Sequence, residues 1–242
     1  MTHVTQMAEL WFDHEPQLDL DALAAAVPGA ERMGDALVHP RFAFTLDDGS
    51  KGALVTTFLT PDGERTDENA ATTEQTWDWE DADAVLARCT HSLLVAELFG
   101  SVRPYRERIE TYVPTLCAAI EQLQPAAVWL PNSERVANPA AILHDRELIA
   151  CLNVRLYGIE DTDHKLMDTL GLHALGLPDL QCAYEHDDPA DIAQLLFDVA
   201  GYLLDHGDVI EDGDDLAERG WVCHDAVSVT EPERRALTLT RP

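Results

Sequence analysis

Acidic side chains gather most densely between residues 205 and 218. The stretch contains Asp205, Asp208, Glu211, Asp212, Asp214, Asp215 and Glu218. Several carboxylate oxygens on a flexible turn are the ligands that Ca²⁺ or Mg²⁺ prefers, so Asp208, Glu211 and Asp212 are candidates for a metal site. The EF-hand pattern fails, however, because Ile210 and Arg219 fall where ligands should stand. A solvated turn after a helix is therefore the favoured interpretation, and we expect no bound metal.

A second set of candidates consists of polar residues inside or beside apolar strings. They are Asn132, Asn153, Arg155, Asp168, Asp179 and Gln181. Such side chains are either buried and hydrogen-bonded or line a site. If they line a catalytic pocket, Arg155 would bind an anionic group through two hydrogen bonds, and Asp168 would orient that group or act as a base.

Thiol and imidazole groups lie close in the sequence at two places, Cys89-x-His91 and Cys223-His224. A thiolate nucleophile or a soft-metal site would need both groups adjacent in space. Both pairs fall in strand-like segments, where alternate side chains are usually core, so a structural role is favoured. The chain also lacks a Gly-x-Ser-x-Gly elbow, a His-Glu-x-x-His helix and a P-loop, and we expect no cofactor.

Net charge limits the partners of this chain. Its 45 Asp and Glu residues face 16 Lys and Arg residues, which gives a formal net charge of −29 over 242 residues. Such a field repels nucleic acid and anionic lipid, and it attracts basic proteins. We therefore expect no nucleic acid and no membrane as partner. If the charge is functional, Asp212, Asp214 and Asp215 are the expected centre of a surface that binds a basic protein.

Composition predicts a globular cytoplasmic protein. Hydrophobic residues make up 46 % of the chain and charged residues 25 %, which is enough apolar material for a core. The N-terminal residues lack the pattern of a secretory signal, and no apolar run approaches the roughly 18 residues of a membrane span. The five cysteines are an odd number without a Cys-x-x-Cys pair, which favours free thiols in a reducing compartment.

The elements that must position these residues read as a mixture of strands and helices. Alternating or continuous apolar residues predict strands over 7–12, 42–46, 53–59, 91–98, 126–130, 154–159, 180–184, 208–210, 221–224 and 236–240. The segments 42–46 and 53–59 form a predicted hairpin around the turn Asp47-Asp48-Gly49-Ser50. Asp19, Asp78 and Asn138 are predicted helix N-caps.

Two longer helices are predicted. One begins at Pro104, and Pro114 should kink or divide it. The other runs from Pro189 to His206, with Asp188 as N-cap and Gly207 as the stop. Its apolar face is formed by Ile192, Leu195, Leu196, Val199, Tyr202 and Leu203.

This order of elements predicts an α+β fold. We expect mixed sheets built from strand–helix–strand units, with helices packed on one face. Residues 1–242 are expected to form a single compact domain, or two subdomains with a boundary near 60–75. The polar stretch around Pro61-Asp62-Gly63 suggests that boundary.

Several local strings resemble a known family. They are Gln75–Trp79, Ser92–Val95, Ala126–Pro131, Leu152–Leu156, Met167–Leu172, Leu175–Gln181 and Gly207–Gly213. Together they are similar to the domain of unknown function 4261 family, over nearly the whole chain. The resemblance implies a bacterial or archaeal cytosolic protein, and it implies no activity and no catalytic residues.

Three functional hypotheses follow. The first is a non-enzymatic interaction protein, of the inhibitor or immunity kind, whose acidic surface binds a basic partner. The second is an enzyme of the hydrolase type that uses carboxylates, with or without a metal. The third is that the acidity only keeps the protein hydrated in a high-salt cytoplasm.

Overall fold

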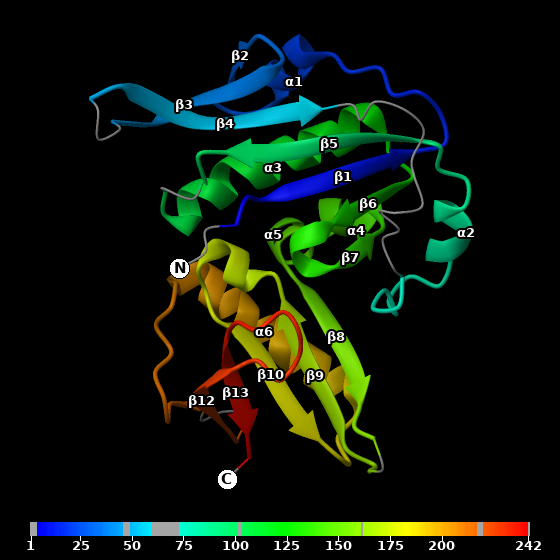
Figure 1. The fold of residues 1–242 in the computed structure, drawn as a ribbon, viewed down its shortest axis with the longest axis vertical. Helices are drawn as coiled ribbons and strands as arrows, with labels where there is room; N and C mark the ends of the chain where they lie inside the picture. The colour runs from blue at the N-terminus through cyan, green and yellow to red at the C-terminus, as the bar shows by residue number, and fades with distance from the viewer. Residues whose placement is uncertain are drawn as a thin grey trace. The chain divides into compact units, whose positions relative to one another are not determined.

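The computed structural model describes residues 4–45, 49–59, 73–100, 103–160, 162–216 and 220–241. The chain forms two compact units, Thr2–Ala150 and Cys151–Pro242, which we call the N-terminal and the C-terminal unit (Figure 1). Both contain helices and a sheet, which confirms the α+β class. Residues 60–72 of the expected boundary near 60–75 lie outside the described residues. The strands on either side of it pair with each other in one sheet.

The N-terminal unit is built on a seven-stranded sheet of order β2-β3-β4-β5-β1-β6-β7. Every neighbouring pair in this sheet is antiparallel. The strands are β1 (Met7–Phe12), β2 (Glu31–Met33), β3 (Ala36–Thr45), β4 (Lys51–Leu59), β5 (His91–Leu98), β6 (Ala127–Leu130) and β7 (Arg135–Ala137). The predicted strands 7–12 and 91–98 and the predicted hairpin are confirmed, although Leu46, Asp47 and Asp48 lie outside the described residues.

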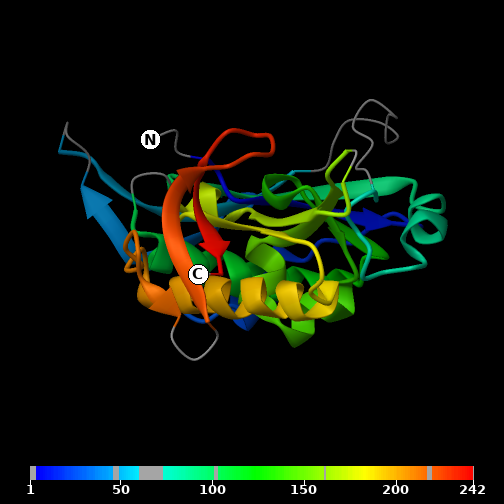
Figure 2. The same cartoon turned by 90° about the horizontal axis from the view of Figure 1, so that it is seen from below.

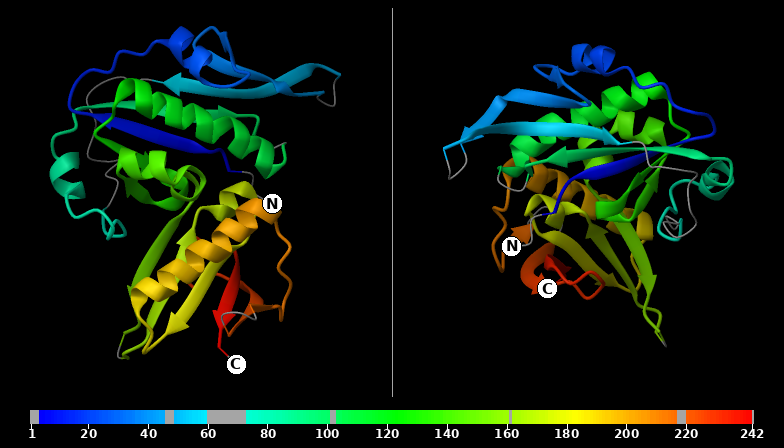
Figure 3. Two further views of the ribbon diagram at one scale, coloured as in Figure 1. Left: turned by 180° about the vertical axis from the view of Figure 1, so that it is seen from behind. Right: turned by 45° about the horizontal axis from the view of Figure 1, so that its top comes forward.

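The helices of this unit are α1 (Leu20–Ala26), α2 (Ala82–Leu86), α3 (Tyr105–Leu123), α4 (Pro139–His144) and α5 (Arg146–Cys151), whose last residue belongs to the C-terminal unit. Helix α3 packs on β4 and β5, and α1 and α4 contact α3 (Figure 3). It connects β5 to β6, which lie on either side of β1. The predicted strand–helix–strand unit is thus present, with β1 inserted between its two strands.

Two of the three predicted N-caps are confirmed in this unit. The Asp19 carboxylate accepts hydrogen bonds from the N–H groups of Asp21 and Ala22, and Asn138 accepts one from Ala140. Asp78 as a cap is wrong, because the residue before α2 is Asp81 and the Asp78 carboxylate pairs instead with Arg135.

Of the expected kink or division at Pro114, the division is wrong, since α3 is continuous through it. Proline removes one backbone donor and costs about 3 kcal/mol in a helix interior. Tertiary packing offsets that cost here, because the neighbours Val113 and Thr115 are both buried. The helix therefore survives as one element of 19 residues.

The C-terminal unit has a six-stranded sheet of order β11-β12-β13-β10-β9-β8. Its strands are β8 (Asn153–Gly158), β9 (Lys165–Leu170), β10 (Asp179–Tyr184), β11 (Asp215–Leu216), β12 (Trp221–Val227) and β13 (Arg235–Thr240). The β10–β13 pair is parallel and the other pairs are antiparallel. The predicted strand over 208–210 is wrong: these residues pair with no strand, and the Asp208 side chain pairs with Arg235.

Helix α6 (Pro189–His206) lies along one face of this sheet, against β8, β9 and β10 (Figure 2). Its predicted ends are confirmed, because Asp188 accepts the N–H of Ala190 and Gly207 follows with a φ of 86°. The predicted apolar face is buried except for Tyr202. Burial of each such aliphatic side chain contributes about 1.5–3 kcal/mol, so this contact organises the unit.

Among the described residues, no helix combines the length and apolar character needed to cross a lipid bilayer.

Candidate functional site

A row of polar side chains crosses one face of the C-terminal sheet. In the strand register Arg155 lies opposite Asp168, Asp168 opposite Gln181, and Gln181 opposite Thr238. Cross-strand partners point to the same face of a sheet, so the four residues share one face. Helix α6 lies on one side of the sheet, and the β12–β13 loop, residues 228–234, lies on the other (Figure 2). The row includes three of the polar residues selected from the sequence.

Arg155 and Asp168, the candidate catalytic pair, form a buried ion pair with two hydrogen bonds. Arg155 Nε lies 3.0 Å from Asp168 Oδ1, and Arg155 Nη2 lies 2.7 Å from Asp168 Oδ2. The two residues are 1 % and 0 % exposed. Arg155 also donates to the backbone oxygen of Glu231 and to the hydroxyl of Thr230, both in the β12–β13 loop. A ligand would reach this pair only if the loop moved away.

Arg234, which the sequence analysis missed, completes the network from the other end of the loop. Its Nη2 lies 2.7 Å from Asp168 Oδ2, and its Nε lies 2.9 Å from Asp179 Oδ2. Two arginines and two aspartates are thereby buried together with balanced charge. A buried charge is tolerated only when it is paired and hydrogen-bonded, and this arrangement meets both requirements.

Asp179 and Gln181 also have structural roles, because their side chains bind other segments of the unit. Asp179 accepts hydrogen bonds from the hydroxyl of Thr169 at 3.0 Å and from the ring Nδ1 of His173 at 3.0 Å. Gln181 donates to the backbone oxygen of Val227 and accepts the N–H of Val229. Asp179 therefore holds the segment that follows β9, and Gln181 holds the start of the β12–β13 loop. The network holds the β12–β13 loop on the sheet, and a catalytic role for Arg155 and Asp168 stays a prediction.

The remaining polar residues of that set lie elsewhere. The Asn132 side chain donates to the backbone oxygen of Thr5 at 2.9 Å in the N-terminal unit. Asn153 is buried at the start of β8, where it lies opposite Leu170.

The acidic side chains of the segment 205–215 are exposed, and the segment has a defined conformation. The Asp214 carboxylate accepts the N–H of Glu211 at 2.8 Å, and the Asp212 carboxylate accepts the N–H of Asp225 at 3.0 Å. Backbone hydrogen bonds join Gly213 and Asp214 to Cys223 on β12. Each carboxylate still has a second oxygen, and the side chains of both residues are exposed. The segment thus presents negative charge from a turn that its own side chains stabilise.

Two of the three candidate metal ligands within this segment, Asp208 and Asp212, have other partners. Asp208 pairs with Arg235, and Asp212 lies 3.5 Å from the ring of His224. Across the described ranges, no three His, Cys, Asp or Glu side chains are grouped so that they could hold a metal ion. Glu218, the last acid of the run, lies outside those ranges.

Two exposed apolar side chains accompany the acidic segment. Tyr202, on the last turn of α6, is 47 % exposed and stacks on His206 with ring centroids 4.3 Å apart. Val209, inside the segment, is 49 % exposed. The sequence analysis assigned Tyr202 to the buried face of α6, and the structure places it outside that face. Tyrosine is enriched in protein–protein interfaces, and the rim of such an interface is polar.

The cysteines are all buried free thiols in the described structure. Burial raises the pKa of Cys182 to about 12 and that of Cys223 to about 11. Cys223 is buried whereas His224 is exposed, because neighbours on a strand point to opposite faces. Cys89 donates to the backbone oxygen of Val85, and the His91 ring contacts Thr90. Neither Cys/His pair is arranged as a nucleophile with its base.

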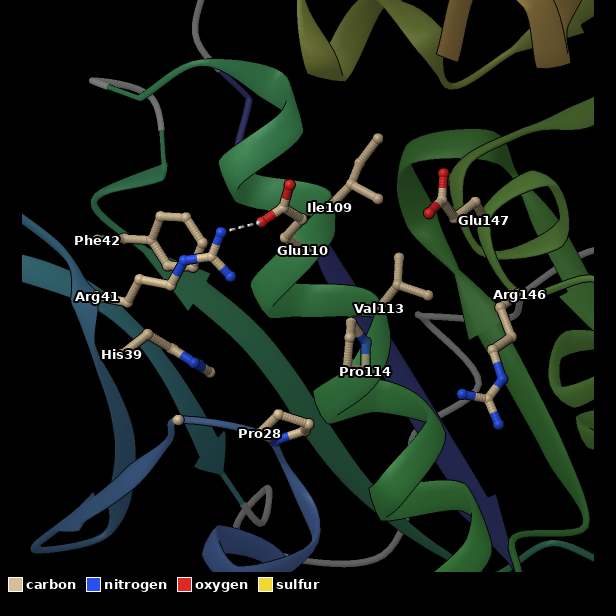
Figure 4. A pocket seen from close by; sticks show the side chains of 11 residues that line it. Pro28, His39, Arg41, Phe42, Ile109, Glu110, Val113, Pro114, Arg146 and Glu147 are labelled. Carbon is tan, nitrogen blue, oxygen red and sulfur yellow. Dashed lines mark ion pairs between the residues drawn. The ribbon is translucent and has the colours of Figure 1, made fainter. Parts of the chain in front are cut away.

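The N-terminal unit contains a hollow beside α3 that the sequence did not reveal (Figure 4). We call it the α3 groove; its volume is about 350 Å³. It is lined by Pro28, Gly29, His39, Arg41, Phe42, Ile109, Glu110, Val113, Pro114, Arg146 and Glu147. Burial lowers the pKa of His39, so this ring is neutral at neutral pH. Because the lining comes from four separate segments of the chain, no local motif could signal it.

Comparison with protein-family models finds a match to part of the chain. Residues 168–240 match the model of Domain of unknown function (DUF4261), which confirms the resemblance for this part of the C-terminal unit. The matched segment contains Asp168, Asp179 and Arg234 of the buried network, and it also contains the acidic segment. No curated protein and no solved structure matches the chain.

Proposed function

We propose that this chain is a cytoplasmic interaction protein whose C-terminal unit binds a basic protein through the acidic segment 205–215. The observation that carries the proposal is the combination of fixed, exposed carboxylates with exposed apolar side chains on one continuous stretch. The acidic residues supply charge, and Tyr202 and Val209 supply contact area. The buried free thiols support a reducing compartment.

Among the described residues, Arg235 pairs with one of the acidic residues of this stretch. The segment carries six carboxylates, on Asp205, Asp208, Glu211, Asp212, Asp214 and Asp215. Arg235 reaches Asp208 and also Asp225, so its charge is shared between two acids. A basic surface that approaches this stretch is attracted over a Debye length, about 10 Å at 0.1 M salt. Such attraction mainly raises the association rate and selects the partner.

Preorganisation strengthens the argument. The carboxylates of Asp212 and Asp214 each accept a backbone N–H, so the turn keeps its shape without a partner. A binding surface that is already ordered loses less conformational entropy on association. Tyrosine adds amphipathic contact area, and it is enriched among the residues that dominate binding energy.

The test is to neutralise the predicted centre without disturbing the turn. A partner is first captured from a native cell lysate and purified, and its association rate is then measured over a range of salt concentrations. The variant replaces Asp212, Asp214 and Asp215 by Asn, whose side-chain oxygen can still accept the backbone N–H groups. We expect the association rate at low salt to fall at least about tenfold and its salt dependence to flatten.

The matched control removes the same charge elsewhere. Asp35, Asp81 and Asp145 are exposed aspartates of the N-terminal unit, and replacing all three by Asn should leave the association rate within about twofold. Equal slowing by both triple variants would show that net charge alone matters. An unchanged rate and salt slope in the Asp212/Asp214/Asp215 variant would contradict the proposal.

A further inference from the structure

We propose that the α3 groove binds a small neutral aromatic molecule that carries one N–H or O–H donor. The backbone carbonyl of Glu110 accepts that donor, because Pro114 cannot donate the helical hydrogen bond to it. The site is independent of the protein-binding surface proposed above, since all of its lining residues belong to the N-terminal unit.

Pro114 leaves a backbone acceptor on the groove side of α3. In an α-helix the N–H of each residue donates to the carbonyl four positions earlier, and proline has no N–H. Pro114 lies inside α3, so the carbonyl of Glu110 lacks its helical hydrogen bond. This carbonyl points along the helix toward Pro114, and both residues line the groove on the same side of α3 (Figure 4). The acceptor therefore faces a molecule that enters the groove.

Rings and aliphatic side chains supply the apolar surface of the groove. Ile109, Val113 and Pro114 line it from α3. The ring of Phe42 and the neutral ring of His39, whose pKa is lowered by burial, line the β3 side. The volume of about 350 Å³ lies near the lower end of the range of roughly 300–1,000 Å³ for small-molecule sites. Aromatic rings pack favourably on one another, so a molecule of one or two rings suits both the size and the walls.

The charged side chains that line the groove favour a neutral ligand, because each of them already has a partner of opposite sign. The pairs are Arg41–Glu110, Arg146–Glu121 and Glu147–Arg106. Figure 4 shows the first of them, in which the guanidinium of Arg41 on β3 turns toward the carboxylate of Glu110 on α3. An ionic ligand would have to compete with these pairs, whereas a neutral ligand that uses the backbone carbonyl leaves them intact.

Binding is tested by amide chemical shifts in NMR spectra of the full chain at about 0.3 M NaCl, which screens the net charge. The probes form two pairs of similar shape. Indole and phenol carry a donor, whereas benzofuran and fluorobenzene lack it. We expect indole and phenol to shift the amides of residues 41–42 and 109–113. Each should bind at least about fivefold more tightly than its counterpart without the donor, a difference typical of one hydrogen bond.

The variant Pro114→Ala assigns the acceptor. Alanine supplies the missing N–H, which then donates to the carbonyl of Glu110 within the helix. The preference for indole over benzofuran should fall below about twofold, while the melting temperature stays the same or rises because the helix gains a hydrogen bond. Pro104→Ala is the matched control, since Pro104 is exposed at the start of the same helix and outside the groove. It should leave the preference within about twofold of that of the unaltered protein.

Four results would overturn the proposal. The first is that neither indole nor phenol shifts the groove amides. The second is that benzofuran binds as tightly as indole. The third is that the charged derivatives tryptamine or indole-3-acetate bind more than about fivefold more tightly than indole, which would make the groove an ion site. The fourth is that the folded Pro114→Ala variant keeps the full preference for indole.

Discussion

Arg234 and Asp168 are 66 positions apart in the sequence, and their side chains meet with Nη2 and Oδ2 2.7 Å apart. The same guanidinium donates to Asp179 through its Nε. This one side chain therefore joins the β12–β13 loop to β9 and β10. A loop fixed in this way adds long-range contacts to a small sheet. We therefore expect the network to raise the free energy of unfolding.

The first prediction concerns this arginine. Arg234→Ala leaves the negative charges of Asp168 and Asp179 buried with one arginine to balance them instead of two. Breaking a buried ion pair costs about 3–5 kcal/mol. The free energy of unfolding, measured by urea denaturation, should fall by that amount. Arg235→Ala is the control, because its pairs with Asp208 and Asp225 are exposed and each contributes at most about 1 kcal/mol. Equal effects of the two substitutions would show that the network adds no special stability.

The second prediction concerns the contact between α6 and its sheet. Leu196 is fully buried, and Leu196→Ala removes apolar contact and leaves a cavity. The free energy of unfolding should decrease by about 2–5 kcal/mol. Gln194→Ala on the exposed side of the same helix should cost less than about 1 kcal/mol, the scale of one exposed side-chain contact. A loss below about 0.5 kcal/mol for Leu196→Ala would mean that the helix does not depend on this face.

The third prediction concerns salt. A net charge of −29 makes the surface repel itself, and screening relieves that repulsion. The Debye length falls from about 10 Å at 0.1 M to about 3 Å at 1 M salt. The melting temperature should therefore rise between these concentrations in both NaCl and KCl. A flat or falling melting temperature would indicate that specific ion pairs already compensate the surface charge.

The fourth prediction concerns the buried thiols and pH. An unfolded cysteine loses its proton near pH 8.5, whereas the folded-state pKa is about 12 for Cys182 and about 11 for Cys223. Above about pH 9 the unfolded chain therefore binds fewer protons than the folded chain. The free energy of unfolding should fall as the pH rises from about 9 to 11. Cys223→Ala should reduce the slope of this decline.

Thiol labelling gives an independent check on the same burial. At pH 8 the native protein should react with a thiol-specific reagent at least about a hundredfold more slowly than the protein in 6 M guanidinium chloride, because only an accessible thiolate reacts. Rapid labelling of Cys182 or Cys223 in the native protein, located by mass spectrometry, would contradict the burial described for β10 and β12.

The sequence determined those features that depend on neighbouring residues. Asp188, Pro189 and Gly207 set the ends of α6, because capping and proline geometry act within a turn. The strand Met7–Phe12 followed from its own apolar residues. The excess of carboxylates is a property of composition alone, and so is the long-range field that it creates.

Tertiary structure decided everything that depends on which segments meet. Asp78 was an acceptable cap by sequence, but a charge-assisted contact with Arg135 of β7 holds its carboxylate instead. The sequence showed Arg155 and Asp168 as polar residues inside apolar strings. Only the strand register made them a pair, and only the docked loop brought Arg234 to Asp168. The α3 groove gathers residues near positions 40, 110 and 146, and no periodicity relates such distant segments. Local rules fix an element and its ends, whereas side-chain partners are fixed by packing across the fold.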